Sequence, residues 1–108
     1  MSEETYPGWY SFIKERHEKF IKALEQLGET VRREGPLDEK TAQLIQLAGA
    51  AANRSEGAVH SHTRRALKAG ATKEEVYHAI ILLTSTMGFP RTSAALSWVY
   101  DVLEGKGE

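Results

Sequence analysis

Apolar residues recur at steps of three and four along most of this 108-residue chain, a period typical of amphipathic helices rather than strands. The first such stretch contains Trp9, Phe12, Ile13, Phe20, Ile21, Leu24 and Leu27. Pro7 suits the first turn of this helix, Gly28 predicts an interruption, and a weaker helical piece follows over residues 31–33. Gly35 and Pro36 together then predict a clear break.

Two further helices are predicted after this break, and the first of them is rich in small side chains. Asp38 is its candidate N-cap, and residues 48–52 are four alanines and one glycine. Such small side chains allow a neighbouring helix to approach closely. The next helix is expected to begin near Ser55 or Glu56 and to end at Gly70, because glycine is common just after a last helical turn.

The last third of the chain predicts two more helices. Thr72 and Glu75 match a capping box, in which a hydroxyl and a carboxylate each satisfy an exposed backbone N–H. Residues 73–87 are apolar on most faces, so we expect this helix to be buried on all sides. Gly88 ends it. The final helix has more apolar surface than a monomer of this size easily buries, and this indicates subunit contacts.

The composition is that of one ordinary globular domain, residues 1–108, and we expect an all-α compact bundle of about five helices. The net charge of −1 lacks the basic excess of a nucleic-acid binder, and the arginine pairs at 32–33 and 64–65 are expected to be solvated. The longest uncharged stretch, residues 76–90, is too short to span a bilayer. Residues 1–5 are polar and acidic, unlike a signal peptide, so we expect a cytoplasmic location.

His62 is the main candidate for chemistry. The residues that share its helix face are small or apolar: Ser55, Ala58, Val59, Ala66 and Ala69. His60 lies about 200° away around the helix, so the two histidines cannot bind one metal together. His17 and His78 show no metal-ligand spacing either, and we expect neither a metal nor another cofactor. Two interpretations of His62 stay open: a core histidine satisfied by a polar neighbour, or a general acid–base lining a small pocket.

A family resemblance adds to this interpretation. Residues 62–76 resemble the core signature of the carboxymuconolactone decarboxylase and alkylhydroperoxidase D superfamily: a histidine, an alanine four positions on, a glycine eight on, and then a Thr/Ser-x-x-Glu helix start. Residues 37–41, 87–90 and 93–95 are similar to the decarboxylase branch. The match covers about residues 36–103, which we take as the core of the domain. It implies an alkylhydroperoxidase D-like helical bundle that assembles as a trimer or hexamer.

The departures from the family pattern bear on the activity. In the peroxidase branch a C-x-x-C pair precedes the histidine and a glutamate upstream relays protons, whereas the matching positions here are Ser55, Ala58 and Gln43. The chain has no cysteine. Serine cannot cycle through a sulfenic acid and a disulfide, and glutamine cannot accept a proton near neutral pH. A thiol peroxidase is therefore not expected.

The decarboxylase branch also lacks the cysteine pair. Its resemblance implies a small anionic lactone or carboxylic acid as substrate, with His62 moving a proton as carbon dioxide leaves. Gln43 replaces the acidic residue of the pattern, and Glu56 is a candidate substitute, so the catalytic candidates are His62, Glu56 and Gln43. The candidate substrate-binding residues are Ser55, Arg54 and Arg91.

Three functional hypotheses follow. The first is a decarboxylase-like enzyme that uses His62. The alternative is a non-catalytic or regulatory binding oligomer on the same scaffold, and the third is a redox protein that borrows thiols from a partner. The expected partners are a small-molecule ligand and further copies of the chain, rather than nucleic acid or a membrane.

Overall fold

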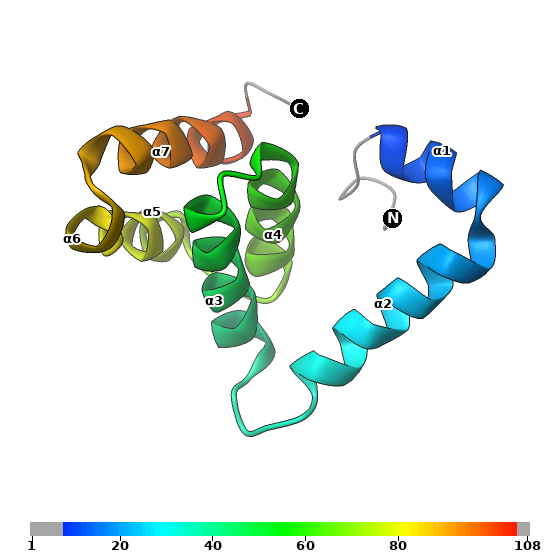
Figure 1. The fold of residues 1–108 in the computed structure, drawn as a ribbon. Coiled ribbons are helices and arrows are strands. Elements are labelled where there is room, and N and C mark those ends of the chain that lie inside the picture. The colour runs from blue at the N-terminus through cyan, green and yellow to red at the C-terminus, as the bar shows by residue number, and fades with distance from the viewer. Residues whose placement is uncertain (1–7, 106–108) are drawn as a thin grey trace.

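The computed structural model describes residues 8–105, which form seven helical segments without a strand (Figure 1). The segments are α1 (Gly8–Arg16), α2 (Glu18–Arg32), α3 (Glu39–Ala52), α4 (Glu56–Lys68), α5 (Lys73–Ile81), α6 (Thr84–Met87) and α7 (Phe89–Leu103). The all-α prediction is confirmed. In this part of the chain no helix has the length and apolar character needed to cross a membrane. The expectations for Pro7 and for residues 1–5 lie outside the described residues.

Helices α3, α4, α5 and α7 build the core. α3 and α4 lie side by side, and α7 packs on both α4 and α5 (Figure 1). The buried apolar residues are Leu47, Ala51, Val59, Ala66, Ala71, Val76, Ile80, Ala95, Val99 and Leu103. Four of these ten are alanines, so the helix axes can approach closely, as the run of small residues in α3 predicts.

The predicted helix starts are confirmed in the core. The Asp38 carboxylate accepts a hydrogen bond of 2.8 Å from the Thr41 N–H and so caps α3. Thr72 and Glu75 form the capping box of α5. The second carboxylate oxygen of Glu75 also accepts from Lys40 Nζ at 3.1 Å, which joins the start of α5 to α3. The hydrogen bonds from Thr72 and Lys40 lower the pKa of Glu75.

The turns on either side of α4 use the left-handed backbone region. Gly70 has a φ of +103° just after α4, where the sequence predicts the helix to end. Arg54, in the turn between α3 and α4, has a φ of +58° and is the only described residue other than glycine with a positive φ. A side chain in this region costs about 1–2 kcal/mol, so this turn is a strained point between two helices that lie against each other.

Two predictions for the helices are wrong. The N-terminal helix breaks at His17, whose φ of −134° and ψ of 63° are not helical, and α2 then runs through Gly28 without interruption. A glycine in a helix interior costs only about 1 kcal/mol relative to alanine, which the neighbouring helix-forming residues offset. Nothing in the local sequence explains the break at His17.

The helix predicted over residues 73–87 is not continuous and not buried on all sides. It divides after Ile81 into α5 and the single turn α6. Ile81 and Leu82 are 51% and 62% exposed, so one apolar face meets solvent in the single chain. Only Val76 and Ile80 of α5 are fully buried against the core. The apolar residues on the other faces of this helix are therefore not fully buried in the single chain.

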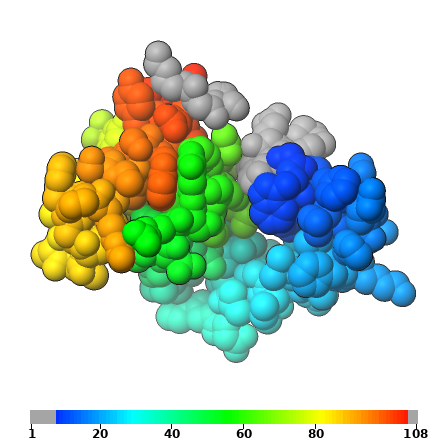
Figure 2. Space-filling view, turned by 45° about the horizontal axis from the view of Figure 1, so that its top comes forward, coloured from blue at the N-terminus to red at the C-terminus, as the bar shows by residue number. Residues whose placement is uncertain are grey.

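Helices α1 and α2 form an arm that stands to one side of the core (Figures 1 and 2). α2 packs extensively only against α1, and Ile21 is its only buried residue. One apolar face of α2 is between 47% and 63% exposed, and it carries Phe20, Leu24, Leu27 and Val31. The arm thus presents an apolar face that the single chain does not cover.

Candidate functional site

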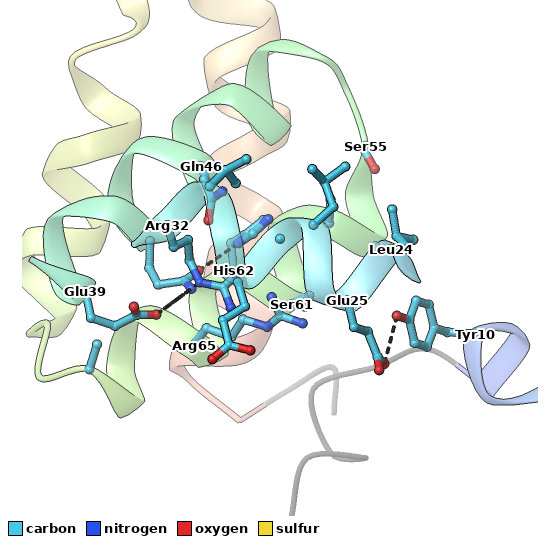
Figure 3. A pocket seen from close by; sticks show the side chains of 18 of the residues that line it. Tyr10, Leu24, Glu25, Arg32, Glu39, Gln46, Ser55, Ser61, His62 and Arg65 are labelled. Carbon is cyan, nitrogen blue, oxygen red and sulfur yellow. Dashed lines mark hydrogen bonds and ion pairs between the residues drawn. The ribbon is translucent and has the colours of Figure 1, made fainter. Parts of the chain in front are cut away.

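A cavity of about 1030 Å³ lies between the arm and the α3–α4 pair (Figure 3). Its walls come from α1, α2, α3 and α4, and its polar lining residues include Glu25, Arg32, Glu39, Gln43, Gln46, Ser55, Ser61, His62, Arg65 and Lys68. The apolar part of the wall comes mainly from the arm, through Trp9, Leu24, Leu27 and Val31. Such a size and mixture of apolar walls with a few polar groups is typical of a small-molecule site.

A chain of hydrogen bonds runs along one wall of this cavity. Nδ1 of His62 lies 2.8 Å from Oε1 of Gln43, and Nε2 of Gln43 donates to the Glu39 carboxylate at 2.9 Å. Arg32 Nε lies 3.5 Å from the same carboxylate oxygen, so this series of hydrogen bonds ends in an ion pair. Glu39 and Gln43 are one turn apart on α3, and Gln43 is fully buried against α4.

These hydrogen bonds fix which nitrogen of the His62 imidazole carries the proton. A carboxylate only accepts hydrogen bonds, so the NH₂ group of Gln43 must face Glu39 and its carbonyl oxygen must face His62. That oxygen also only accepts, and Nδ1 of His62 must therefore carry the proton. In the neutral imidazole Nε2 is then the unprotonated nitrogen, and among residues 8–105 it makes no hydrogen bond.

The positive charges of the cavity also act on His62. Burial, followed by the guanidinium groups of Arg65 and Arg32, lowers the pKa of His62 to about 4. His62 is therefore neutral near pH 7. The cavity is a partly apolar space whose wall carries three basic and three acidic side chains, and it contains one neutral imidazole with an unprotonated Nε2. The charged residues are Arg32, Arg65, Lys68, Glu25, Glu29 and Glu39.

Three comparisons with known proteins bear on the family and the fold of this chain. The carboxymuconolactone decarboxylase family model matches residues 18–101. The chain belongs to this family. It is 30% identical over 90 residues to an uncharacterized protein of Methanocaldococcus jannaschii, a match that covers 83% of this chain and 84% of the relative. Its fold is similar to that of the apo form of a carboxymuconolactone decarboxylase family protein from Legionella pneumophila, with a TM-score of 0.77 and 22% identity, over 91% of this chain and 87% of the other.

The structure brings together three of the residues that the family resemblance singles out. His62, Gln43 and Ser55 all line the cavity, and the first two contact each other. Ala58, at the position of the second cysteine in the peroxidase branch, lies on the same wall. Ser55 begins α4 without a side-chain capping bond, so its hydroxyl is available to a ligand.

The other three candidate site residues lie away from His62. Arg54 and Arg91 lie at a separate hollow of about 180 Å³ beside Trp98, so they do not face His62. Glu56 does not line the large cavity, and it lies beside His60 on another side of α4. The reason is helical geometry, because Glu56 and His62 are six residues apart and about 240° around the helix.

Sequence reasoning missed the charged residues that do surround His62: Arg32, Glu39 and Arg65. The positions of two of them could have been inferred from helical spacing, since Arg65 is three residues after His62 and Glu39 is four residues before Gln43. Arg32 carries none, because its place depends on how α2 meets α3. The expectation that the arginine pairs are solvated is wrong for Arg32, whose side chain is only 20% exposed.

Proposed function

We propose that this cavity binds a small anionic carboxylic acid or lactone, and that His62 transfers a proton to it in a decarboxylase-like reaction. The observation that carries the proposal is the free Nε2 of His62 in a cavity that also holds Arg32 and Arg65. Guanidinium groups bind carboxylates in planar, often bidentate pairs. An anion between them would therefore lie close to the imidazole.

The chemistry of decarboxylation explains what such an imidazole would do. When a carboxylate leaves as carbon dioxide, the electron pair of the broken bond stays on the neighbouring carbon. A proton must then reach that carbon, and a protonated Nε2 can supply it. His62 returns to its neutral form, and one proton is taken up from solvent for each molecule of carbon dioxide released.

Ligand charge would prepare His62 for this role. Burial and the two guanidinium groups lower the pKa of His62 to about 4. A bound carboxylate offsets the positive charge of Arg32 and Arg65, and an anion near the imidazole favours its charged form. Substrate binding would therefore raise the pKa of His62 and let Nε2 take up the proton that it later donates.

The test is a thermal-shift panel of lactones, dicarboxylates and quinone-like acids, followed by assays of carbon dioxide release with every compound that stabilises the protein. We expect at least one anionic compound to raise the Tm of the wild type. His62→Ala should bind it and lose turnover. Arg65→Gln should lose the stabilisation, whereas Arg64→Gln, a matched control outside the cavity, should keep it.

A second candidate function is a binding protein without turnover. Gln43 occupies the position next to His62 where a carboxylate would raise the pKa of the imidazole, and this observation favours a site that holds a ligand without moving protons. Under this function an anionic compound would stabilise the wild type, and neither carbon dioxide nor any other product would form. Stabilisation by no anion in the panel would contradict both functions.

We also propose that the chain is a homo-oligomer, a trimer or hexamer, assembled through the exposed face of α2 rather than through the final helix, whose Ala95, Val99 and Leu103 are buried within the chain. A contiguous apolar face of four large side chains is unusual on the surface of a monomer. Leu24, Leu27 and Val31 belong both to this face and to the cavity wall. A second copy packed on α2 would therefore also close one side of the cavity and exclude water from it.

A further inference from the structure

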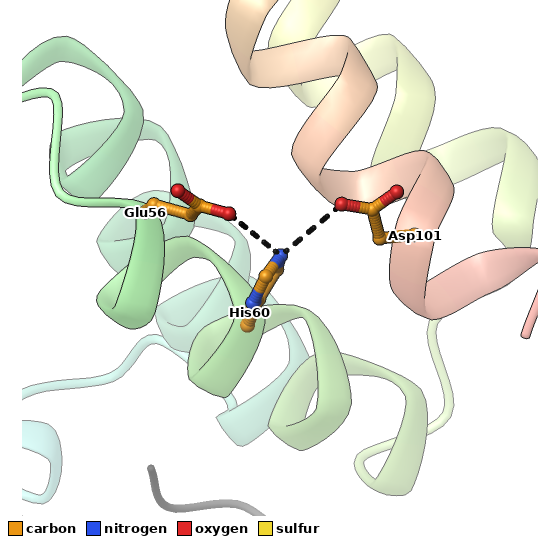
Figure 4. A group of neighbouring side chains, drawn as sticks. All are labelled: Glu56, His60 and Asp101. Carbon is orange, nitrogen blue, oxygen red and sulfur yellow. Dashed lines mark ion pairs between the residues drawn. The ribbon is translucent and has the colours of Figure 1, made fainter. Parts of the chain in front are cut away.

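A second group of ligand atoms lies on the opposite side of α4 from His62. It consists of Glu56 and His60 on α4 and Asp101 on α7 (Figure 4). Nε2 of His60 lies 3.9 Å from Oε2 of Glu56 and 3.7 Å from Oδ2 of Asp101. All three side chains point toward one common point between the two helices. The three atoms lie within 4.8 Å of one another.

The polar atoms of this group are not satisfied by the protein. Nε2 of His60 is buried and makes no hydrogen bond, and the distances to both carboxylates are too long for one. Within residues 8–105, neither Glu56 nor Asp101 forms an ion pair with a lysine or arginine. Two carboxylates that face one buried nitrogen, with no lysine or arginine of the described residues paired to them, form an arrangement that a bound cation would stabilise.

We propose that Glu56, His60 and Asp101 bind a divalent transition-metal ion, with Zn²⁺ as the representative ion. Nitrogen and carboxylate ligands about 2.1 Å from a zinc ion at tetrahedral angles lie about 3.4 Å apart. The observed separations of 3.7 and 3.9 Å are close to that spacing, and all three atoms lie within 4.8 Å of one another, so rotation of the two carboxylates can bring them to it. Glu56 and His60 are also four residues apart on one helix, a spacing that puts two ligands on the same face.

The ligand set favours a transition metal over calcium or magnesium. Calcium and magnesium take oxygen ligands, and an imidazole nitrogen is not among those they prefer. Three protein ligands leave at least one coordination position for water, and the exposed side of Glu56 gives solvent access to it. The ion would hold α4 and α7 together at a point outside the apolar core.

This site is independent of the cavity around His62. His60 and His62 project from α4 about 200° apart, and none of the three proposed ligands lines the cavity. The three residues match no histidine-pair motif, so the sequence alone does not reveal the site. Its third ligand is 41 residues beyond His60 and reaches it only through the packing of α7 on α4.

The test is titration of the untagged, metal-free protein with zinc chloride by calorimetry, together with the visible absorption of the Co²⁺ complex. We expect one ion per chain in the wild type. Asp101→Asn removes the charge of one ligand and His60→Gln removes the imidazole nitrogen, so each should weaken zinc binding roughly tenfold or more. His78→Gln, in an exposed histidine of α5, and His62→Gln should bind zinc as the wild type does.

Circular dichroism and the Tm of each variant without metal show whether it is folded, so a loss of binding can be assigned to the lost ligand. Asp101→Asn keeps the shape of the side chain and removes only its charge, which makes it the more informative of the two. No zinc binding by the wild type would overturn the proposal. Equal binding by wild type and Asp101→Asn would overturn it as well, because the ion would then lie elsewhere.

Discussion

Gln43 and His62 are joined across the α3–α4 contact by a hydrogen bond of 2.8 Å, with the amide oxygen on the acceptor side. The amide has no charge, so it orients the imidazole and selects its Nδ1–H form without stabilising a positive charge on the ring. A carboxylate at this position would do both. Burial, Arg65 and Arg32 lower the pKa of His62, and Gln43 supplies no negative charge that would oppose them.

Gln43→Glu should therefore raise the pKa of His62 from about 4 toward or above its ordinary value of 6.5. The measurement is an NMR titration of the imidazole signals in wild type and variant. Ile45→Glu is the matched control, because it adds the same charge at an exposed position of α3 that does not line the cavity. An unchanged His62 titration in Gln43→Glu would mean that the carboxylate does not face the ring.

Stability should fall as the pH is lowered from 6.5 to 4, with His62 responsible for part of the loss. The unfolded chain binds a proton at His62 below its ordinary pKa of 6.5, whereas the folded chain binds it only below about 4. The contribution of neutral His62 is thus complete above pH 6.5 and is lost as the pH falls through 4. Carboxylates also titrate in part of this pH range, so the Tm of His62→Gln should be compared with that of the wild type at each pH. The two curves should converge toward low pH; parallel curves would contradict the assignment.

The apolar core around α3 should be sensitive to loss of volume. Leu47 is fully buried among residues of α3, α4, α5 and α7, so Leu47→Ala should lower the free energy of unfolding by about 2–5 kcal/mol. Denaturant unfolding followed by circular dichroism measures the change. Ile45→Ala, in a side chain that is 53% exposed on the same helix, should change the free energy much less. Equal effects would show that α3 is buried on a different face.

The oligomer should depend on the apolar face of α2. We expect light scattering at micromolar concentration to give a trimer or hexamer for the wild type, and Leu24→Lys with Leu27→Lys to give smaller species. Lys22→Ala changes the polar face of the same helix and should leave the assembly intact. A wild-type monomer would contradict the assembly, and an unchanged oligomer in the double variant would place the interface elsewhere.

Much of the fold follows from short-range signals in the sequence. Asp38, Thr72 and Glu75 predict the starts of α3 and α5, because a capping side chain acts on backbone groups only two or three residues away. Gly70 likewise ends α4 where expected. The break at His17 has no such local cause, and the division of α5 from α6 depends on what each turn contacts.

The candidate site was predictable only along single helices. The position of His62 on a face of small residues follows from helical period, and the opposite orientation of His60 is confirmed for the same reason. The separation of Arg54 and Arg91 from His62, and the approach of Arg32 to Glu39, depend on how helices meet. Period and spacing contain no information about such angles between elements.

The separate position of the arm has a consequence for local unfolding. A 15-residue helix is barely stable alone in water, and α2 has one buried residue and close packing only with α1. Its amide protons should therefore exchange with deuterated solvent faster than those of α4, and dilution should speed the exchange further if a second copy covers α2. Exchange in α4 should not respond to dilution, because its neighbours belong to the same chain.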